Sequence, residues 1–316
     1  MGWARGGGGH QPLNELTQPG RLRRVRATAH AKLTLSLAVY ERRDDDFHEV
    51  EALAVSIADP SDVVEVEAVP HPPGITLELT GLSDDIPTGP DNLAARAAED
   101  LLIAAGRSGH GVRMWLRKSI PMRAGLGGGS ADAAAALAAV RRLLDVDVDQ
   151  ERLQSLAAEV GSDVPFCLTG GTAWVRGRGE LLEPVHLAGP LMLVLALPPL
   201  QLATPDVYDA WDELGGPIAM RRVPAPPAVA PLVEDLGNDL ELAAERVEPR
   251  LADFRADLEA AADAPAVLAG SGSAYAVLLD TDSPTEATAL ARRISRRLKV
   301  PVVGTRAVTH GVRLSA

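Results

Sequence analysis

The sequence predicts a two-domain α+β protein, and three observations lead to this prediction. The chain has 316 residues, more than one hydrophobic core usually organises. Segments with the alternation or the apolar runs of β-strands are interspersed with alanine- and leucine-rich segments of helical periodicity. Finally, a predicted strand at 112–118 runs through a glycine-rich loop into a long helical segment. This order of elements is typical of sites where a helix N-terminus binds an anion.

Composition narrows the partners that such a protein would have. The chain carries 31 Lys and Arg against 43 Asp and Glu, a formal net charge of −12. Nucleic acids and anionic membranes require a positive surface, so neither is expected as a partner. No stretch approaches the ~20 apolar residues of a membrane-spanning helix. Cys167 is the single cysteine, so no internal disulfide forms and a cytoplasmic location is expected.

Two breaks in the composition divide the chain. Residues 1–20 are rich in glycine and lack the apolar run of a secretory signal, which predicts a disordered tail. A proline-bounded segment at 184–190 separates an N-terminal domain, 21–186, from a C-terminal domain, 187–316. The sequence leaves the oligomeric state open between a monomer and a homodimer.

The N-terminal domain is predicted to begin with a strand at 22–39. Leu33 and Leu35 alternate with Lys32 and Thr34, so apolar and polar side chains face opposite sides. The polar face would meet either solvent, as in many antiparallel sheets, or a cleft. Further strands are expected at 50–57, 62–68, 75–79 and 112–118, and a helix capped by Asp91 is expected to run to about Gly106.

The glycine loop is the most distinctive segment of the chain. Gly125, Gly127, Gly128 and Gly129 let the backbone adopt positive φ and approach a ligand closely. The loop opens into a predicted helix at 131–144, whose free N–H groups and dipole favour a phosphate. The glycine spacing fits neither the dinucleotide fingerprint nor the Walker loop, because no Gly-Lys-Ser/Thr follows. The alternative interpretation is an irregular turn ahead of a packed helix.

The remaining elements alternate between helix and strand. A helix at 150–160 ends at Gly161, and Asp163 follows as a turn or cap residue. Later elements are a hairpin at 170–180, a buried strand at 191–197, a helix with Thr204 as cap, a proline-rich loop at 215–231, helical sequence from Gly237, strands at 266–268 and 274–279, a helix at 284–298 with structural cations in its last turns, and a strand at 300–308.

The loop motif Pro-x-x-x-Gly-Leu-Gly-Gly-Gly-Ser-Ala-Asp-Ala-Ala resembles the ATP-phosphate loop of the GHMP kinases. The resemblance implies their two-domain architecture, with an N-terminal half like domain 2 of ribosomal protein S5 and a ferredoxin-like C-terminal half. It also implies ATP as cofactor, with Mg²⁺ carried on its phosphates. No metal site of the protein's own is expected, because the seven histidines show no ligand spacing. The residues implied for ATP are Pro121, Met122, Arg123, Ala124, Gly125, Leu126, Gly127, Gly128, Gly129, Ser130 and Ala131.

Two further segments resemble one branch of that family, the 4-diphosphocytidyl-2-C-methyl-D-erythritol kinases. They read Ala-Lys-Leu-x-Leu from Ala31 and Arg-x-Asp-x-Phe-His from Arg43. The resemblance implies that Lys32 lies beside the reacting hydroxyl and phosphate. It further implies that Phe47 and His48 hold the cytosine, by stacking and by hydrogen bonding respectively.

Three positions depart from the branch pattern: Thr34 stands for Asn, Asp46 for Gly and Phe47 for Tyr. Thr34 is still implied to bind substrate, and Phe47 keeps a stacking surface while losing a hydroxyl. The later segment Gly-x-Asp-Val-Pro-Phe implies that Asp163 contacts the acceptor hydroxyl, which makes it the catalytic acid–base candidate. Thr204 is implied to border the substrate, although helix capping alone would account for it.

The resemblance therefore implies an ATP-dependent small-molecule kinase that phosphorylates the 2-hydroxyl of 4-diphosphocytidyl-2-C-methyl-D-erythritol in the non-mevalonate isoprenoid route. A GHMP kinase for mevalonate-like or homoserine-like acceptors would share the loop but should lack the Arg-x-Asp-x-Phe-His segment. A nucleotide-binding module without turnover is a second alternative, which the presence of both Lys32 and Asp163 disfavours. A scaffold without any ligand would leave the glycine loop unexplained.

Overall fold

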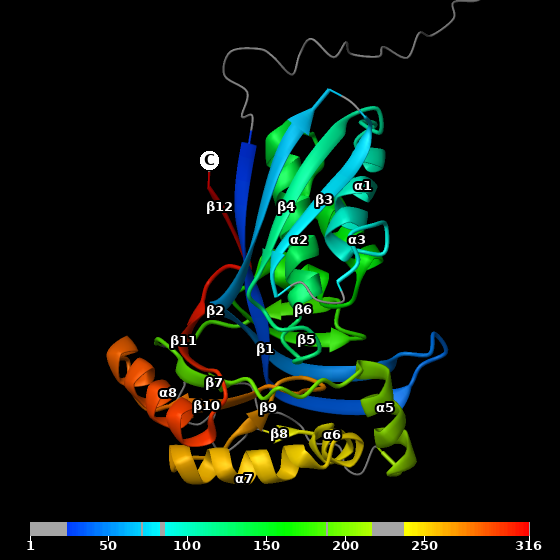
Figure 1. Cartoon of the computed structure of the whole chain (residues 1–316). Helices are drawn as coiled ribbons and strands as arrows, with labels where there is room; N and C mark the ends of the chain where they lie inside the picture. The colour runs from blue at the N-terminus through cyan, green and yellow to red at the C-terminus, as the bar shows by residue number, and fades with distance from the viewer. Residues whose placement is uncertain (1–23, 71, 83–85, 188, 217–236, 316) are drawn as a thin grey trace, which may run out of the picture.

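The computed structural model of the chain describes residues 24–70, 72–82, 86–187, 189–216 and 237–315. Within these residues the chain forms twelve strands and eight helices (Figure 1). The strands are β1 (Arg24–Arg42), β2 (His48–Val69), β3 (Gly74–Gly81), β4 (Gly111–Lys118), β5 (Thr172–Gly177), β6 (Leu181–Pro184), β7 (Met192–Ala196), β8 (Gly237–Asn238), β9 (Val267–Leu268), β10 (Tyr275–Leu279), β11 (Val302–Val308) and β12 (Val312–Ser315). The helices are α1 (Leu93–Ala104), α2 (Gly128–Leu144), α3 (Gln150–Val160), α4 (Val164–Thr169), α5 (Thr204–Glu213), α6 (Glu241–Val247), α7 (Arg250–Ala262) and α8 (Pro284–Leu298).

The long strands β1 and β2 run through both halves of the molecule and connect them (Figure 1). The main path of the sheet is β12-β1-β2-β11-β7-β10-β9. The C-terminal part of β2 pairs with β4, which carries β3, and its N-terminal part pairs with β5. The strands expected at 50–57 and 62–68 are thus one continuous strand. Because β12 returns to β1, the end of the chain lies beside its first strand.

Both faces of β1 are covered, which decides between the two interpretations of its polar face. Leu33 is fully buried, as expected for the core-facing side. Thr34 and Ser36 on the other face are only 3% and 4% exposed. The register with β2 shifts between Thr34 and Ser36, and such an irregularity bends a strand. The polar face of β1 therefore looks into the protein, and the solvent-facing interpretation is wrong.

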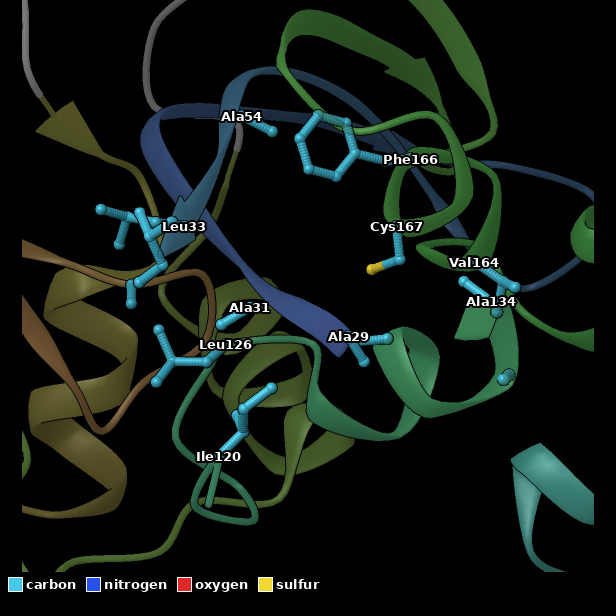
Figure 2. Close-up of a cluster of buried hydrophobic side chains, with 14 of the residues drawn as sticks. Ala29, Ala31, Leu33, Ala54, Ile120, Leu126, Ala134, Val164, Phe166 and Cys167 are labelled. Carbon is cyan, nitrogen blue, oxygen red and sulfur yellow. The ribbon is translucent and has the colours of Figure 1, made fainter. Parts of the chain in front are cut away.

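Helix α2 packs closely on the sheet because its buried side is made largely of alanine. Ala133–Ala136 are fully buried, and α2 contacts β1, β2, α1 and α4. Figure 2 shows the region where these elements meet, with Ala134 of α2 and Cys167 of α4 in one apolar cluster with Ala29 of β1. Leu126 belongs to the same cluster, so the glycine loop is anchored in the core.

The turn between β9 and β10 fixes the other side of the glycine loop. The N–H of Ala274 donates to the carbonyl oxygen of Ala124 at 3.1 Å. The side-chain amide of Asn238 in turn donates to the carbonyl oxygens of Leu268 and Gly270, at 2.9 and 2.6 Å. The first bond connects the loop to the C-terminal part of the chain, and the two Asn238 bonds hold the turn that makes this connection.

Two helix caps differ from the sequence prediction. Asn92, and not Asp91, caps α1, because its side-chain oxygen accepts hydrogen bonds from two N–H groups of the first turn, at 2.9 and 3.3 Å. Thr204 is the first residue inside α5 and makes no capping bond. Its hydroxyl is instead 2.9 Å from the hydroxyl of Ser271. The side chain of Thr204 therefore joins α5 to the turn after β9.

Other predictions differ in element type or lie outside the described residues. The sequence predicts helix from Gly237, whereas Gly237 and Asn238 form β8 beside β1, and α6 starts at Glu241. Strand β12 has no counterpart in the prediction. The predicted tail at 1–20 and most of the loop at 215–231 lie outside the described residues. The predicted domain boundary falls between β6 and β7 and stays a prediction.

Replacing Gly125 by Ala is expected to destabilise the protein. Gly125 has a φ of +75°, and a Cβ atom there would lie 1.7 Å from the carbonyl oxygen of Ala269. The left-handed conformation alone costs a non-glycine residue about 1–2 kcal/mol, and the backbone must also move. We expect urea denaturation to show a loss of about 2 kcal/mol or more in the free energy of unfolding.

The control for this prediction is Gly89→Ala. A Cβ atom at Gly89 would meet no atom within 4 Å. Its free energy of unfolding should change by less than about 0.5 kcal/mol. Similar losses for the two variants would contradict the tight packing of Gly125 against the turn.

Candidate active site

A cavity of about 720 Å³ lies between the glycine loop, the N-terminal strands and α5. This volume is within the range of small-molecule sites. All of the predicted site residues line it except Ala131, which is 1% exposed within α2. Its lining includes Lys32, Thr34, Phe47, His48, the loop residues from Pro121 to Ser130, Asp163 and Thr204. The lining extends in sequence from Lys32 to Ser271, so segments far apart along the chain meet at one site.

The glycine loop and the start of α2 form the anion-binding end of the cavity. Gly125 and Gly127 adopt positive φ, whereas Gly128 already begins the helix, three residues earlier than predicted. Gly127 is the N-cap, and the first intrahelical bond runs from Ala131 N–H to its carbonyl oxygen at 2.8 Å. The first turn of α2 contains no acidic residue. Its N–H groups and the positive end of the helix dipole are therefore available to an anion.

Lys32 and Asp163 meet beside this loop. The Lys32 Nζ and Asp163 Oδ1 atoms are 2.6 Å apart, with the side chains 14% and 33% exposed. The Lys32 N–H donates to the carbonyl oxygen of Leu126 at 3.0 Å. A Cβ atom on Gly127 would lie 3.4 Å from Lys32 Cβ and 3.8 Å from Asp163 Oδ2. A phosphate on the loop would therefore be adjacent to both charged side chains.

Aromatic side chains form the opposite end of the cavity. The ring of His48 is buried and stacks on Tyr208, with 5.1 Å between ring centroids. Its Nε2 atom is 2.8 Å from Asp212 Oδ1. Phe47 is 46% exposed, and the guanidinium carbon of Arg178 lies 5.2 Å from the centre of its ring. A flat ring could stack here with hydrogen-bonding groups at its edge.

Comparison with known proteins identifies the family. Residues 92–171 match the family model described as the GHMP kinases N terminal domain. The 4-diphosphocytidyl-2-C-methyl-D-erythritol kinase of Pelotomaculum thermopropionicum is 40% identical over 282 residues, covering 87% of this chain and 96% of the relative. The chain belongs to the GHMP kinase family. The kinase of the same name from Moorella thermoacetica is 39% identical, covering 86% of this chain and 93% of the relative.

Solved structures confirm the predicted GHMP kinase fold. A crystal structure of 4-(cytidine 5'-diphospho)-2C-methyl-D-erythritol kinase aligns with a TM-score of 0.72 and 36% identity, covering 90% of this chain and 99% of that one. Homoserine kinase from Cytophaga hutchinsonii aligns with a TM-score of 0.68 at 17% identity, covering 94% and 99% of the two chains. At that identity the likeness concerns the fold alone.

Three buried charged residues beside the glycine loop of this GHMP kinase were not expected from the sequence. Lys118 Nζ donates to Asp62 and lies 2.5 Å from Asp132 Oδ2. Asp62 Oδ1 also accepts the N–H groups of Ser119 and Ile120, at 2.5 and 2.9 Å. These bonds fix the backbone that enters the loop. The one sequence feature that could have predicted this cluster is Asp132, an acidic residue within the alanine-rich segment that forms the buried face of α2.

Burial determines the protonation preferences in this cluster. Burial raises the pKa of Asp132 well above its ordinary value; the Lys118 ammonium opposes this shift and the Asp62 carboxylate adds to it. Burial alone would lower the pKa of Lys118, but the two carboxylates outweigh it and raise that pKa. Asp132 also has one carboxylate oxygen, Oδ1, without a hydrogen-bond partner. Lys118 therefore remains charged, and Asp132 favours its neutral form.

The cavity also has an apolar section near the start of α1. Ile86, Leu93, Ile120 and Met122 line it together with the polar side chain of Asn92. They lie beside the anion-binding end, because a Cβ atom on Gly129 would be 3.3 Å from Leu93 Cδ1 and one on Gly128 would be 3.0 Å from Ile120 Cγ2. The section can therefore receive an apolar or flat part of the same ligand.

The described residues contain neither a membrane-spanning helix nor a ready-made metal site. No helix in this part of the chain has both the length and the apolar character needed to cross a membrane. Among the same residues, no three His, Cys, Asp or Glu side chains are grouped so that they could hold a metal ion.

Asp132→Asn is expected to stabilise the protein increasingly as the pH rises. Because the pKa of Asp132 is raised in the folded state, the folded protein binds a proton that the unfolded chain has lost above its pKa near 3.8. The free energy of unfolding of the native protein therefore falls as the pH rises toward the folded-state pKa. The asparagine variant lacks this loss.

Urea denaturation at about pH 5 and about pH 8 measures this effect. The difference in free energy of unfolding, variant minus native protein, should be more positive at the higher pH. An equal difference at both pH values would show that the carboxyl group of Asp132 does not bind a proton preferentially in the folded state.

Proposed function

We propose that this chain transfers the γ-phosphoryl group of ATP to the 2-hydroxyl of 4-diphosphocytidyl-2-C-methyl-D-erythritol, a step of the non-mevalonate isoprenoid route. The observation that carries the proposal is the meeting of Lys32 and Asp163, 2.6 Å apart, beside Gly127 of the loop, where a Cβ atom would lie within 4 Å of both residues. The same cavity contains the Phe47 and His48 pair that marks the branch. Relatives at about 40% identity over most of the chain carry the name of this activity. A cytoplasmic location accords with the single, buried Cys167.

In the proposed complex, ATP phosphates lie on the N–H groups of the loop and the first turn of α2. The positive end of α2 stabilises their charge, and the absent side chain of Gly127 leaves the space beside Lys32 and Asp163 open. The adenine would occupy the apolar section formed by Leu93 and Met122. This orientation points the γ-phosphate toward Lys32 and Asp163.

The two charged residues position the reacting groups in this proposal. Phosphoryl transfer passes through a loose transition state, so alignment and charge neutralisation contribute most of the acceleration. Lys32 stabilises charge that develops on the transferred phosphoryl group, and Asp163 accepts a hydrogen bond from the acceptor hydroxyl. The 2.6 Å contact between them keeps the carboxylate aimed at the hydroxyl. The proton leaves the hydroxyl toward Asp163 late in the transfer.

Mg²⁺ fits the same arrangement as a partner of ATP. This ion is usually held by substrate phosphates, water and one or two carboxylates, and not by a cage of protein ligands. Asp163 Oδ2 faces the loop, 3.8 Å from the Cβ position of Gly127, and Ser130 lines the cavity nearby. These two side chains would hold the ion and its waters. When bound, Mg²⁺ neutralises charge on the transferring phosphates.

The two alternative functions would each need only part of this cavity. Kinases for mevalonate or homoserine share the loop, but they have no need of the Phe47 and His48 end. A nucleotide-binding module without turnover has no need of a lysine–aspartate pair beside the loop. Both ends are present here in one cavity, which favours a kinase with a large, base-containing acceptor.

Asp163→Asn is expected to abolish turnover while changing ATP affinity by no more than a few-fold. The amide retains the shape of Asp163 but cannot accept a proton from the hydroxyl. Coupled ADP release measures turnover, and titration with a non-hydrolysable ATP analogue measures affinity. Asp206→Asn on the exposed side of α5 is the matched control and should keep full activity. Near-native turnover in the Asp163 variant would remove Asp163 from the mechanism.

A panel of acceptors is expected to separate the candidate functions. With ATP and Mg²⁺, the protein should release ADP in the presence of 4-diphosphocytidyl-2-C-methyl-D-erythritol and not with mevalonate or homoserine. The reason is that only the first compound has a base for Phe47 and His48. Faster turnover with either of the other two acceptors would contradict the proposed substrate, and no ADP release with any would favour the module without turnover.

A further inference from the structure

We propose that Asp212 is a positioning residue that fixes the tautomer of His48 and thereby makes the cavity prefer a cytosine base over a uracil base. The inference rests on the proposed function, because it takes the aromatic end of the cavity as the site of the base. Asp212 lies on α5 behind His48, outside the cavity lining, and its side chain is 35% exposed. It would therefore act on the ligand only through His48.

Three contacts from α5 hold the imidazole ring of His48 in one orientation. Asp212 Oδ1 is 2.8 Å from Nε2. Tyr208 stacks on the ring with an interplanar angle of 28°, and Trp211 packs against it in a T-shaped arrangement with centroids 5.3 Å apart. His48 is only 7% exposed, yet it lines the cavity. The ring thus has a fixed position with one nitrogen already engaged.

The chemistry of the partner assigns the proton on this ring. An ionised carboxylate accepts hydrogen bonds and cannot donate, so Nε2 must carry the hydrogen that lies toward Asp212. In the neutral ring, Nδ1 then has a lone pair and acts only as an acceptor. Partners behind a histidine commonly select its tautomer in this way. Asp212 therefore leaves His48 with an acceptor for the ligand.

An acceptor at this position distinguishes the two pyrimidines. Cytosine has an exocyclic amino group, N4, that donates hydrogen bonds, whereas uracil has the carbonyl oxygen O4 in the same place. A cytosine would donate to Nδ1 of His48, but a uracil would place two acceptors against each other. Sites that hydrogen-bond a substrate group reject analogues lacking that group strongly, because buried polar atoms are left unpaired.

The test is the ratio of CDP to UDP affinity, measured by isothermal titration calorimetry with a saturating non-hydrolysable ATP analogue occupying the nucleotide site. The native protein should bind CDP more tightly than UDP. In Asp212→Asn the side chain can accept or donate, so His48 can adopt either tautomer, and the ratio should fall by about tenfold or more. Asp212→Ala, which also removes the partner, should lower the ratio as well.

Glu213→Gln is the matched control, because it changes the neighbouring acidic residue and its exposed ion pair with Arg246, 2.8 Å long, without touching His48. Its CDP to UDP ratio should equal that of the native protein. In a His48→Phe background, Asp212→Asn should cause no further change of the ratio, since Asp212 acts through the imidazole. With the cytidine acceptor, Asp212→Asn should raise KM with little change in kcat.

Several outcomes would overturn the inference. These are a native protein that binds CDP and UDP equally, a ratio in Asp212→Asn within about twofold of the native value, or an equal effect in the His48→Phe background. Failure of the proposed function is recognised separately, because the native protein would then not phosphorylate the cytidine acceptor at all. Normal phosphorylation with an unchanged ratio would refute the role of Asp212 alone.

Discussion

The hydrogen bond from the N–H of Lys32 to the carbonyl oxygen of Leu126 ties the first strand to the glycine loop. The side chain of the same lysine pairs with Asp163, so one residue sets both the loop-to-strand and the lysine-to-carboxylate distances. Gly127 lies beside the two residues, and a Cβ atom there would be 3.4 Å from Lys32 Cβ and 3.8 Å from Asp163 Oδ2. Phosphoryl transfer loses rate steeply when reacting groups shift by about 1 Å. The surrounding structure keeps this junction of Lys32, the glycine loop and Asp163 in place.

The surrounding fold supports that junction from three directions. The alanine face of α2 brings the helix N-terminus close to β1, and Leu126 anchors the loop in the same core (Figure 2). The turn after β9 holds the loop from the other side through Ala274. Lys118 and Asp62 fix the chain that enters the loop. A glycine-rich segment can therefore present its N–H groups in a defined arrangement, although glycine is the residue with the most conformational freedom to lose on folding.

Charge is used differently in two neighbouring parts of the site. Lys118 is buried against Asp62 and Asp132, so its charge stabilises this cluster and the loop backbone that the cluster holds. Within the described part of the chain, Lys32 pairs with the Asp163 carboxylate alone and remains partly exposed to the cavity, where a phosphate can reach it. The helix dipole of α2 adds positive potential without a formal charge. This explains how a chain with a net charge of −12 can bind anionic ligands.

The sequence by itself determined the strand–loop–helix unit, the family and those residues of the cavity lining that belong to its motifs, because glycine density, helix-forming runs and short motifs are local properties. Only the tertiary structure decided what depends on contacts between distant segments. It buried the polar face of β1, placed Thr204 against Ser271, paired Gly237 and Asn238 with β1 and joined Lys118 with Asp62 and Asp132. It also placed Asp212 behind His48, although 164 residues separate the two in sequence. Such pairings arise from chain topology and burial, which no local pattern of residue types records.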